Sequence, residues 1–206
     1  MALPLTQSYT DTLIRLLPVT ITGFLVNRTL IKEADDEFIF DNVIIALFAL
    51  LFALAFAWTF FKDKKAHRRT QLKASFIPTS AGILFIASFF ITDAVLEARD
   101  KSPILIQAGY DGGYNGAWFE FRYDGTYKFA NSGGIGATFF RGKYTLNDSL
   151  ITLDQDNIDN VIKSRLLAIR NITTFNRSEN ILYQINPQHQ VIDNEYKFTI
   201  HMDKHQ

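Results

Sequence analysis

The chain of 206 residues contains no cysteine and has no net charge, since 21 basic residues balance 21 acidic ones. The missing cysteine excludes disulfides, thiolate metal sites and thiol catalysis. Balanced charge, which also holds for residues 102–206 alone, gives no electrostatic reason to expect a nucleic-acid polymer as a partner. We expect no cleavable signal peptide, because the opening MALPLTQSYT lacks a basic segment followed by an apolar one.

What the chain does have is long uncharged apolar sequence. Residues 43–61 read VIIALFALLFALAFAWTFF, and a second apolar run covers 76–92. A helix of about 20 such residues crosses the ~30 Å hydrocarbon core of a bilayer. We therefore predict an integral membrane protein with a transmembrane helical hairpin over 38–98, whose two helices are joined by a loop at 62–75.

The joining loop is strongly basic, and only Asp63 opposes its positive charges. Short cytoplasmic loops are enriched in Lys and Arg, and the outer ends of both apolar runs are acidic or mixed. We predict that the loop is cytoplasmic, that the protein is in the inner (plasma) membrane of a bacterium, and that the C-terminal domain is extracytoplasmic (periplasmic). The residues that determine this topology are Lys62, Lys64, Lys65, Arg68, Arg69 and Lys73.

The first 37 residues leave two alternatives open. Residues 12–31 are mostly apolar but include Arg15, Pro18, Asn27 and Arg28. This segment is either a third span or an amphipathic helix that lies at the membrane surface, and the surface helix is our preferred alternative. The choice does not move the C-terminal domain, because the basic loop fixes the orientation of the later spans.

Residues 102–206 show short alternating runs typical of β-strands. Aromatic residues alternate with polar ones, as in Phe119, Phe121 and Tyr123, and Asp124-Gly125 is a strong hairpin signal. We predict eight strands, at 104–110, 117–123, 126–131, 137–144, 149–153, 162–170, 181–185 and 196–201. The predicted fold class is an α + β membrane protein: a helical hairpin, with a possible third N-terminal helix, and a small antiparallel β-meander or barrel. Its interior is either packed or hollow.

The segment FRYDGTYKFANSGGIGATFFRGKYTLNDSLITLD resembles the lipocalin-like β-domains of Bacteroidota, which share an aromatic strand, Asp/Asn-Gly-Thr, a second aromatic strand and Gly-x-Tyr. The likeness covers roughly residues 116–172 and implies a small β-meander without specifying a ligand. The whole architecture is also similar to that of two-transmembrane, β-strand-rich antiphage effectors, which implies a barrel that binds a cyclic nucleotide and helices that damage the membrane. A cytoplasmic barrel would be required for that role.

The sequence shows no arrangement of residues that carries chemistry. We find no nucleophile motif, and we predict no enzyme activity, no cofactor and no metal site. His201, Asp203 and His205 are close in sequence, but we interpret them as a solvated tail. The loop that begins at Asp154 starts like a calcium loop and then lacks its glycine and final glutamate, so we interpret it as a turn.

We therefore predict a non-enzymatic protein whose barrel binds a partner protein or a small ligand. The expected partners are membrane lipid and either another protein or further copies of the chain. The alternatives are the membrane-disrupting effector and a structural subunit of a larger membrane complex. The predicted ligand-binding residues, chosen from their positions on the strands and loops of a barrel, are Tyr110, Tyr114, Trp118, Tyr127, Arg141 and Tyr144.

Overall fold

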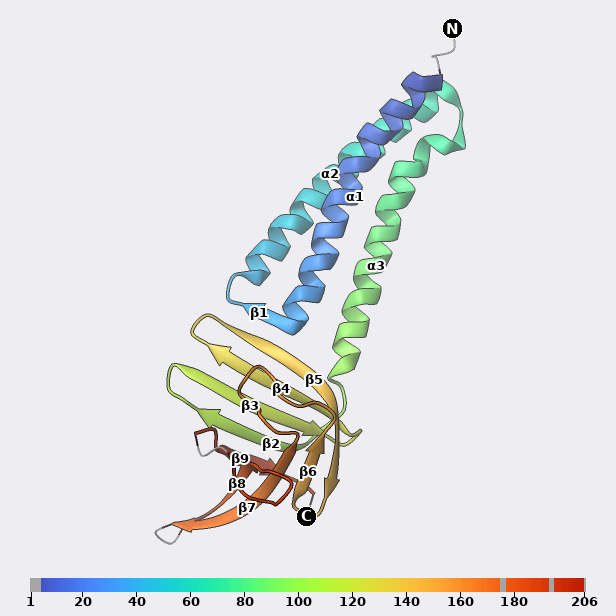
Figure 1. Cartoon of the computed structure of the whole chain (residues 1–206). Coiled ribbons are helices and arrows are strands. Elements are labelled where there is room, and N and C mark those ends of the chain that lie inside the picture. The colour runs from blue at the N-terminus through green and yellow to red at the C-terminus, as the bar shows by residue number, and fades with distance from the viewer. Residues whose placement is uncertain (1–4, 175–176, 193–194, 206) are drawn as a thin grey trace. The chain divides into compact units, whose positions relative to one another are not determined.

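The computed structural model describes residues 5–174, 177–192 and 195–205. The chain divides into two compact units (Figure 1). One is helical and contains the chain up to Ala34 together with Ile39–Asp100, and the other is a β-unit built from Asp35–Phe38 and the chain from Lys101 onward. Three long apolar helices and a closed, eight-stranded antiparallel barrel confirm the predicted fold class.

The helical unit contains α1 (Leu5–Asp35), α2 (Asp41–Thr70) and α3 (Ile77–Arg99), with a short 3₁₀ helix at Lys73–Phe76 between the last two. Each of the three segments Tyr9–Asp35, Asp41–Thr70 and Lys73–Arg99 is long and apolar enough to cross a membrane. Large apolar side chains stand exposed along these helices, as lipid contact requires; they include Leu17, Leu47, Leu54, Leu84, Phe90 and Ile91.

The three helices pack through aromatic side chains and small residues. The Phe52 ring meets Phe85 and Phe89 edge-on, and Val19 and Val26 of α1 are buried against the same cluster. Gly82 permits this close approach, because a Cβ there would lie 2.3 Å from the Phe56 ring. Small residues at helix crossings are typical of membrane helices.

A buried polar network also joins the helices. Asp63 of α2 is fully buried and accepts a hydrogen bond from Arg15 of α1 at 2.5 Å. Its second oxygen accepts from the Thr79 amide at 2.9 Å and the Thr79 hydroxyl at 2.7 Å. The Thr59 hydroxyl donates to the Arg15 carbonyl oxygen at 3.1 Å. Each charge is thereby paired and hydrogen-bonded, which a buried ion pair requires.

The predicted loop at 62–75 differs from the structure, because α2 continues through this basic sequence as far as Thr70. Basic side chains in a last helical turn interact favourably with the helix dipole, which explains why the helix persists beyond its apolar part. It ends at Gln71, which has a left-handed backbone (φ 56°) and donates its N–H to the His67 carbonyl oxygen. The connection that remains before the 3₁₀ helix is short.

The barrel is formed by eight strands, and their order around the wall is β5-β4-β3-β2-β9-β8-β7-β6, closed by pairing of β6 with β5. All pairs are antiparallel, and most neighbours are consecutive in sequence. The strands are β2 (Ile104–Asp111), β3 (Asn115–Arg122), β4 (Thr126–Gly133), β5 (Gly136–Asn147), β6 (Leu150–Leu153), β7 (Leu166–Thr174), β8 (Arg177–Gln184) and β9 (Phe198–Asp203).

Inward-facing side chains fill the barrel. Phe119 and Phe121 of β3 stack at 5.1 Å between ring centroids, and Phe129 and Phe198 pack against Phe119 from β4 and β9. Leu and Ile from the remaining strands complete this core. The predicted period of two therefore marks the interior correctly, and the interior is packed.

A ninth strand, β1 (Asp36–Phe38), lies between α1 and α2 in sequence and pairs antiparallel with β5. It uses the part of β5 around Gly136–Thr138, whereas β6 pairs with β5 at Tyr144–Asn147. The short acidic segment therefore covers the part of the β5 edge that barrel closure leaves unpaired. Sequence analysis missed this strand, because three residues carry no alternation.

All eight predicted strands exist; β6 and β9 begin one and two residues later than predicted, and β7 begins four residues later. Residues 162–165 precede β7 and pass over a buried glutamine side chain. The amide of Gln184 donates to the Val161 carbonyl oxygen at 2.9 Å and accepts from the Lys163 N–H at 2.6 Å. The Gln184 side chain makes the hydrogen bonds that a neighbouring strand would otherwise make with this backbone. Val161 and Ile162 are therefore buried without belonging to a strand.

Candidate functional site

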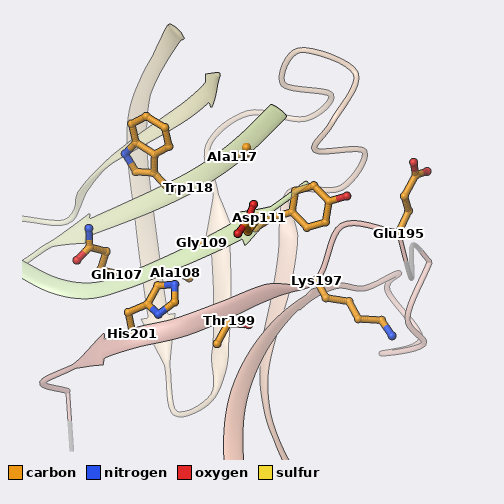
Figure 2. Close-up of a pocket in the computed structure, with 12 residues that line it drawn as sticks. Gln107, Ala108, Gly109, Asp111, Ala117, Trp118, Glu195, Lys197, Thr199 and His201 are labelled. Atoms are coloured by element: carbon orange, nitrogen blue, oxygen red, sulfur yellow. The ribbon is translucent and has the colours of Figure 1, made fainter. Parts of the chain in front are cut away.

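The outer wall of the barrel carries a groove that is a candidate binding site of the β-unit. It crosses β3, β2 and β9 and has a volume of about 550 Å³. Because Ile106 and Ala108 face the core, their neighbours Gln107, Gly109 and Asp111 face outward into the groove. Figure 2 shows these residues with Trp118 on one side and Thr199 and His201 on the other.

Gly109 forms the floor of the groove. It is paired in register with Trp118 of β3 and with Thr199 of β9. A Cβ at this position would lie 3.1 Å from the Nε2 atom of His201, so the absence of a side chain keeps the space between the indole and the imidazole open. A close backbone surface beneath a ligand is a common use of glycine in a strand.

Residues on the neighbouring strands β4 and β5 support the Trp118 side chain, which forms one wall of the groove. Its indole meets the Phe139 ring edge-on at 6.4 Å, across the small side chain of Ala130. The ammonium group of Lys128 lies over the Phe139 ring, 4.2 Å from the ring centroid, in a cation–π contact. This outward position of Lys128 agrees with strand parity, which places it opposite the inward Tyr127 and Phe129.

The opposite end of the groove is charged. Glu195 and Lys197 lie there with both signs of charge, whereas His201, near Gln107 and away from these two residues, adds a side chain that can donate or accept a hydrogen bond (Figure 2). The Asp111 carboxylate already accepts a hydrogen bond from the Gly113 N–H within its own turn, at 2.8 Å. The groove therefore combines an indole, bare backbone and a mixed polar end.

Two of the six predicted ligand-binding residues line this groove. Trp118 forms its wall, and Tyr110 contributes to it and to a smaller recess of about 280 Å³ beside it, where its ring packs on Tyr196. Tyr114 is 82% exposed and lies outside both. Arg141 is on β5 and forms an ion pair with Asp35 at 3.0 Å.

The remaining two, Tyr127 and Tyr144, belong to the packed interior. Burial, together with the nearby negative charge of Asp154, raises the pKa of Tyr127. Its hydroxyl makes no well-formed hydrogen bond within the described residues. The Tyr144 hydroxyl donates to the Arg122 carbonyl oxygen at 2.8 Å, and burial, with a smaller effect of Asp124, raises the pKa of Tyr144. Strand parity identifies inward residues without showing that they fill the barrel.

Sequence reasoning predicted a strand at 196–201 but did not include any residue of β9, or of the segment before it, among the candidate site residues. His201 is in a strand rather than in a solvated tail, because β9 continues to Asp203. The alternation of Phe198 with Thr199 and Ile200 with His201 was the available signal that His201 faces outward. Across the described ranges 5–174, 177–192 and 195–205, no group of three or more His, Asp or Glu residues is placed to hold a metal ion.

Comparisons of the chain with family models, with curated proteins and with solved structures found no match.

Proposed function

We propose that this protein is a membrane-anchored binding protein without enzymatic activity, whose barrel receives a segment of a partner protein in the groove over β3, β2 and β9. The groove is the observation that supports this proposal. Because aromatic and aliphatic side chains occupy the barrel interior, a ligand has to bind at the wall.

The composition of the groove suits a peptide segment. An indole over bare strand backbone offers an apolar surface, and a peptide also has donors and acceptors that Glu195, Lys197 and His201 can meet. The strands beneath the groove are paired on both sides, so recognition has to use side chains rather than addition of a strand. A small ligand with an apolar ring is the alternative occupant.

We propose further that the barrel faces the extracytoplasmic side of a bacterial inner membrane. The basic end of α2 supports this orientation, because Lys and Arg are enriched on the cytoplasmic side of short connections. A reporter that is active only outside the cytoplasm, fused after Gln206, should be active, and the same reporter inserted at Gln71 should be silent. The reverse pattern would favour the nucleotide-gated effector, and cyclic dinucleotide binding would then be measured.

Site-specific photocrosslinking tests the groove directly. A photoreactive residue replaces Gln107 in the groove or, as a control, the exposed Thr145 on β5. We expect a discrete crosslinked product from position 107 only, and its loss when Gly109→Phe fills the groove. The matched variant Thr145→Phe should leave the product unchanged.

Two results would contradict the proposal. Equal crosslinking from both positions would mean that the groove has no special occupant. A stable hetero-complex that survives detergent extraction with Gly109→Phe present would instead favour the structural subunit, whose docking surface lies elsewhere. A crosslinked product heavier than the protein by only the mass of a small molecule would identify the occupant as the alternative, a small ligand.

A further inference from the structure

The helical unit contains a cationic pocket between α1 and α2. It has a volume of about 240 Å³, and the residues with polar or aromatic side chains that line it are Asp11, Arg15, Trp58, Lys62, Lys65 and Arg69. The α2 residues of this set are spaced by four, three and four positions, so they lie along one face of the helix. The volume is below the ~300–1,000 Å³ of pockets for drug-sized ligands, which suits a small charged group.

The pocket has a net positive charge. Arg15 is already paired with Asp63, so its charge is balanced inside the bundle. Within the part of the chain that the structure describes, Lys62, Lys65 and Arg69 form no ion pair with a carboxylate. Asp11 is the one acidic residue among the lining residues, against these three cations. An anion would relieve the repulsion between them.

The pocket lies where the apolar part of α2 ends. With 30 residues the helix is about 45 Å long, whereas the hydrocarbon core takes up about 20 residues, or ~30 Å. If the uncharged run 43–61 occupies the core, Lys62–Arg69 lie at the depth of the lipid headgroups. Trp58, one turn before Lys62 and 5.8 Å from its ammonium group, is a typical interfacial residue.

The buried polar network fixes the walls of the pocket at this depth. Asp63 holds Arg15 and Thr79, and the Thr59 hydroxyl holds the Arg15 backbone. The spacing between α1 and α2 is therefore set by bonds that do not involve Lys62, Lys65 or Arg69. A ligand that enters meets cations on a preformed wall, which lowers the cost of binding.

We propose that this pocket binds the phosphate headgroup of an anionic phospholipid. Basic pockets between transmembrane helices on the cytoplasmic side are suited to such headgroups. The pocket is within the helical unit, and the proposal does not depend on the groove of the barrel. It assigns Lys62, Lys65 and Arg69 a ligand in addition to their effect on topology.

Lipid binding by full-length protein in nanodiscs tests the proposal. The discs contain phosphatidylcholine with or without phosphatidylglycerol, and retained lipid is measured by native mass spectrometry. We compare Lys62→Gln/Lys65→Gln/Arg69→Gln with Lys64→Gln/Arg68→Gln/Lys73→Gln, which removes the same charge from positions outside the pocket. We expect wild type and the control to retain phosphatidylglycerol, and the pocket variant to bind it at least about tenfold more weakly than the control.

A charge-preserving variant and three contrary outcomes complete the test. The charge-preserving Lys62→Arg/Lys65→Arg variant should retain the lipid, which shows that a loss in the glutamine variant reflects charge. Equal loss in both glutamine variants would overturn the proposal, since it would mean diffuse surface attraction. Retention of phosphatidylcholine to the same extent would also overturn it. Displacement of the lipid by millimolar inorganic phosphate would do so as well, since it would identify a site for a soluble anion.

Discussion

At the scale of single residues, Asp63 connects all three helices. Its two carboxylate oxygens serve Arg15 of α1 and Thr79 of α3, and the carboxylate is fully buried. Asp63→Ala should therefore leave a buried arginine unpaired, which costs about 3–5 kcal/mol of stability. We expect a clearly lower midpoint of thermal unfolding, measured by circular dichroism of the detergent-solubilised protein.

The double variant Arg15→Met/Asp63→Leu provides the control for this prediction. It removes both charges and replaces them with apolar side chains of similar volume, so it should recover most of the lost stability. Conversely, a double variant that is as unstable as Asp63→Ala would show that packing around these positions, and not the unpaired charge, sets the stability.

The buried tyrosines of the barrel predict a loss of stability at alkaline pH. Burial raises the pKa of Tyr127 and of Tyr144 above the usual value of 10.0. A raised folded-state pKa favours the neutral phenol, so this stabilisation is complete below about pH 10 and is lost as the pH rises further. We expect the urea midpoint of the barrel to fall as the pH rises above about 10, and two tyrosines to ionise later than the others by phenolate absorbance.

The Tyr127→Phe variant sharpens this prediction. The Tyr127 hydroxyl makes no well-formed hydrogen bond among the described residues, so its removal should cost little at neutral pH and should weaken the alkaline loss. Tyr114→Phe, at an exposed position, should change neither property. An alkaline transition that stays unchanged in Tyr127→Phe would attribute it to other groups.

The sequence predicted the position of Tyr127 better than the buried contacts of Asp63. Alternation placed Tyr127 on the inner face, because a strand has a period of two. Whether that face lines a cavity or a packed core depends on side chains from all eight strands, which no local pattern reports. Asp63 is the opposite case: its sequence neighbours are basic and exposed, and its partners Arg15 and Thr79 are brought to it only by helix packing.

At the scale of elements, β1 is a short strand that pairs with β5 in addition to the eight strands of the barrel. It pairs with β5 through Phe38 and Gly136, and a Cβ at Gly136 would lie 2.4 Å from the Glu37 carbonyl oxygen. That atom belongs to the backbone and cannot turn aside. Gly136→Ala should therefore release β1, while β6 still closes the barrel at Tyr144–Asn147.

Hydrogen exchange measures this release. In Gly136→Ala the amides of residues 36–38 should exchange much faster, and those of Phe119 and Phe129 should stay protected. Gly133→Ala is the matched control, because a Cβ there would approach only the Asn115 side chain, at 3.2 Å. Unchanged exchange at 36–38 in Gly136→Ala would show that the pairing does not persist in solution.

The element boundaries that sequence predicted best are those set by turns. Asp124-Gly125 ends one strand and begins the next as expected, and Gly125 has the positive φ of 79° that such a turn requires. The boundaries it missed depend on distant partners. β1 exists because part of the β5 edge is otherwise unpaired. β7 begins late because the backbone before it, at Lys163, donates its hydrogen bond to the Gln184 side chain instead of to a neighbouring strand.

At the scale of the whole molecule, α1 decides how many times the chain crosses the membrane. Its segment Tyr9–Asp35 is long and apolar enough to span a membrane. The buried ion pair with Asp63 balances the charge of Arg15, which lowers the cost of placing this arginine in a membrane-spanning helix. We therefore propose three spans. Three crossings place the start of α1 and the turn at Gln71 on one side and the barrel on the other, whereas a surface-lying α1 would leave its start on the barrel side.

The absence of cysteine makes this difference directly measurable. Single variants Tyr9→Cys, Gln71→Cys and Asp148→Cys are labelled in intact cells with a maleimide that cannot cross the membrane. Tyr9 is 71% exposed, so its position is accessible. We expect labelling at position 148 alone, and labelling at positions 9 and 71 only after permeabilisation. Labelling of positions 9 and 148 together in intact cells would mean that α1 lies on the membrane surface.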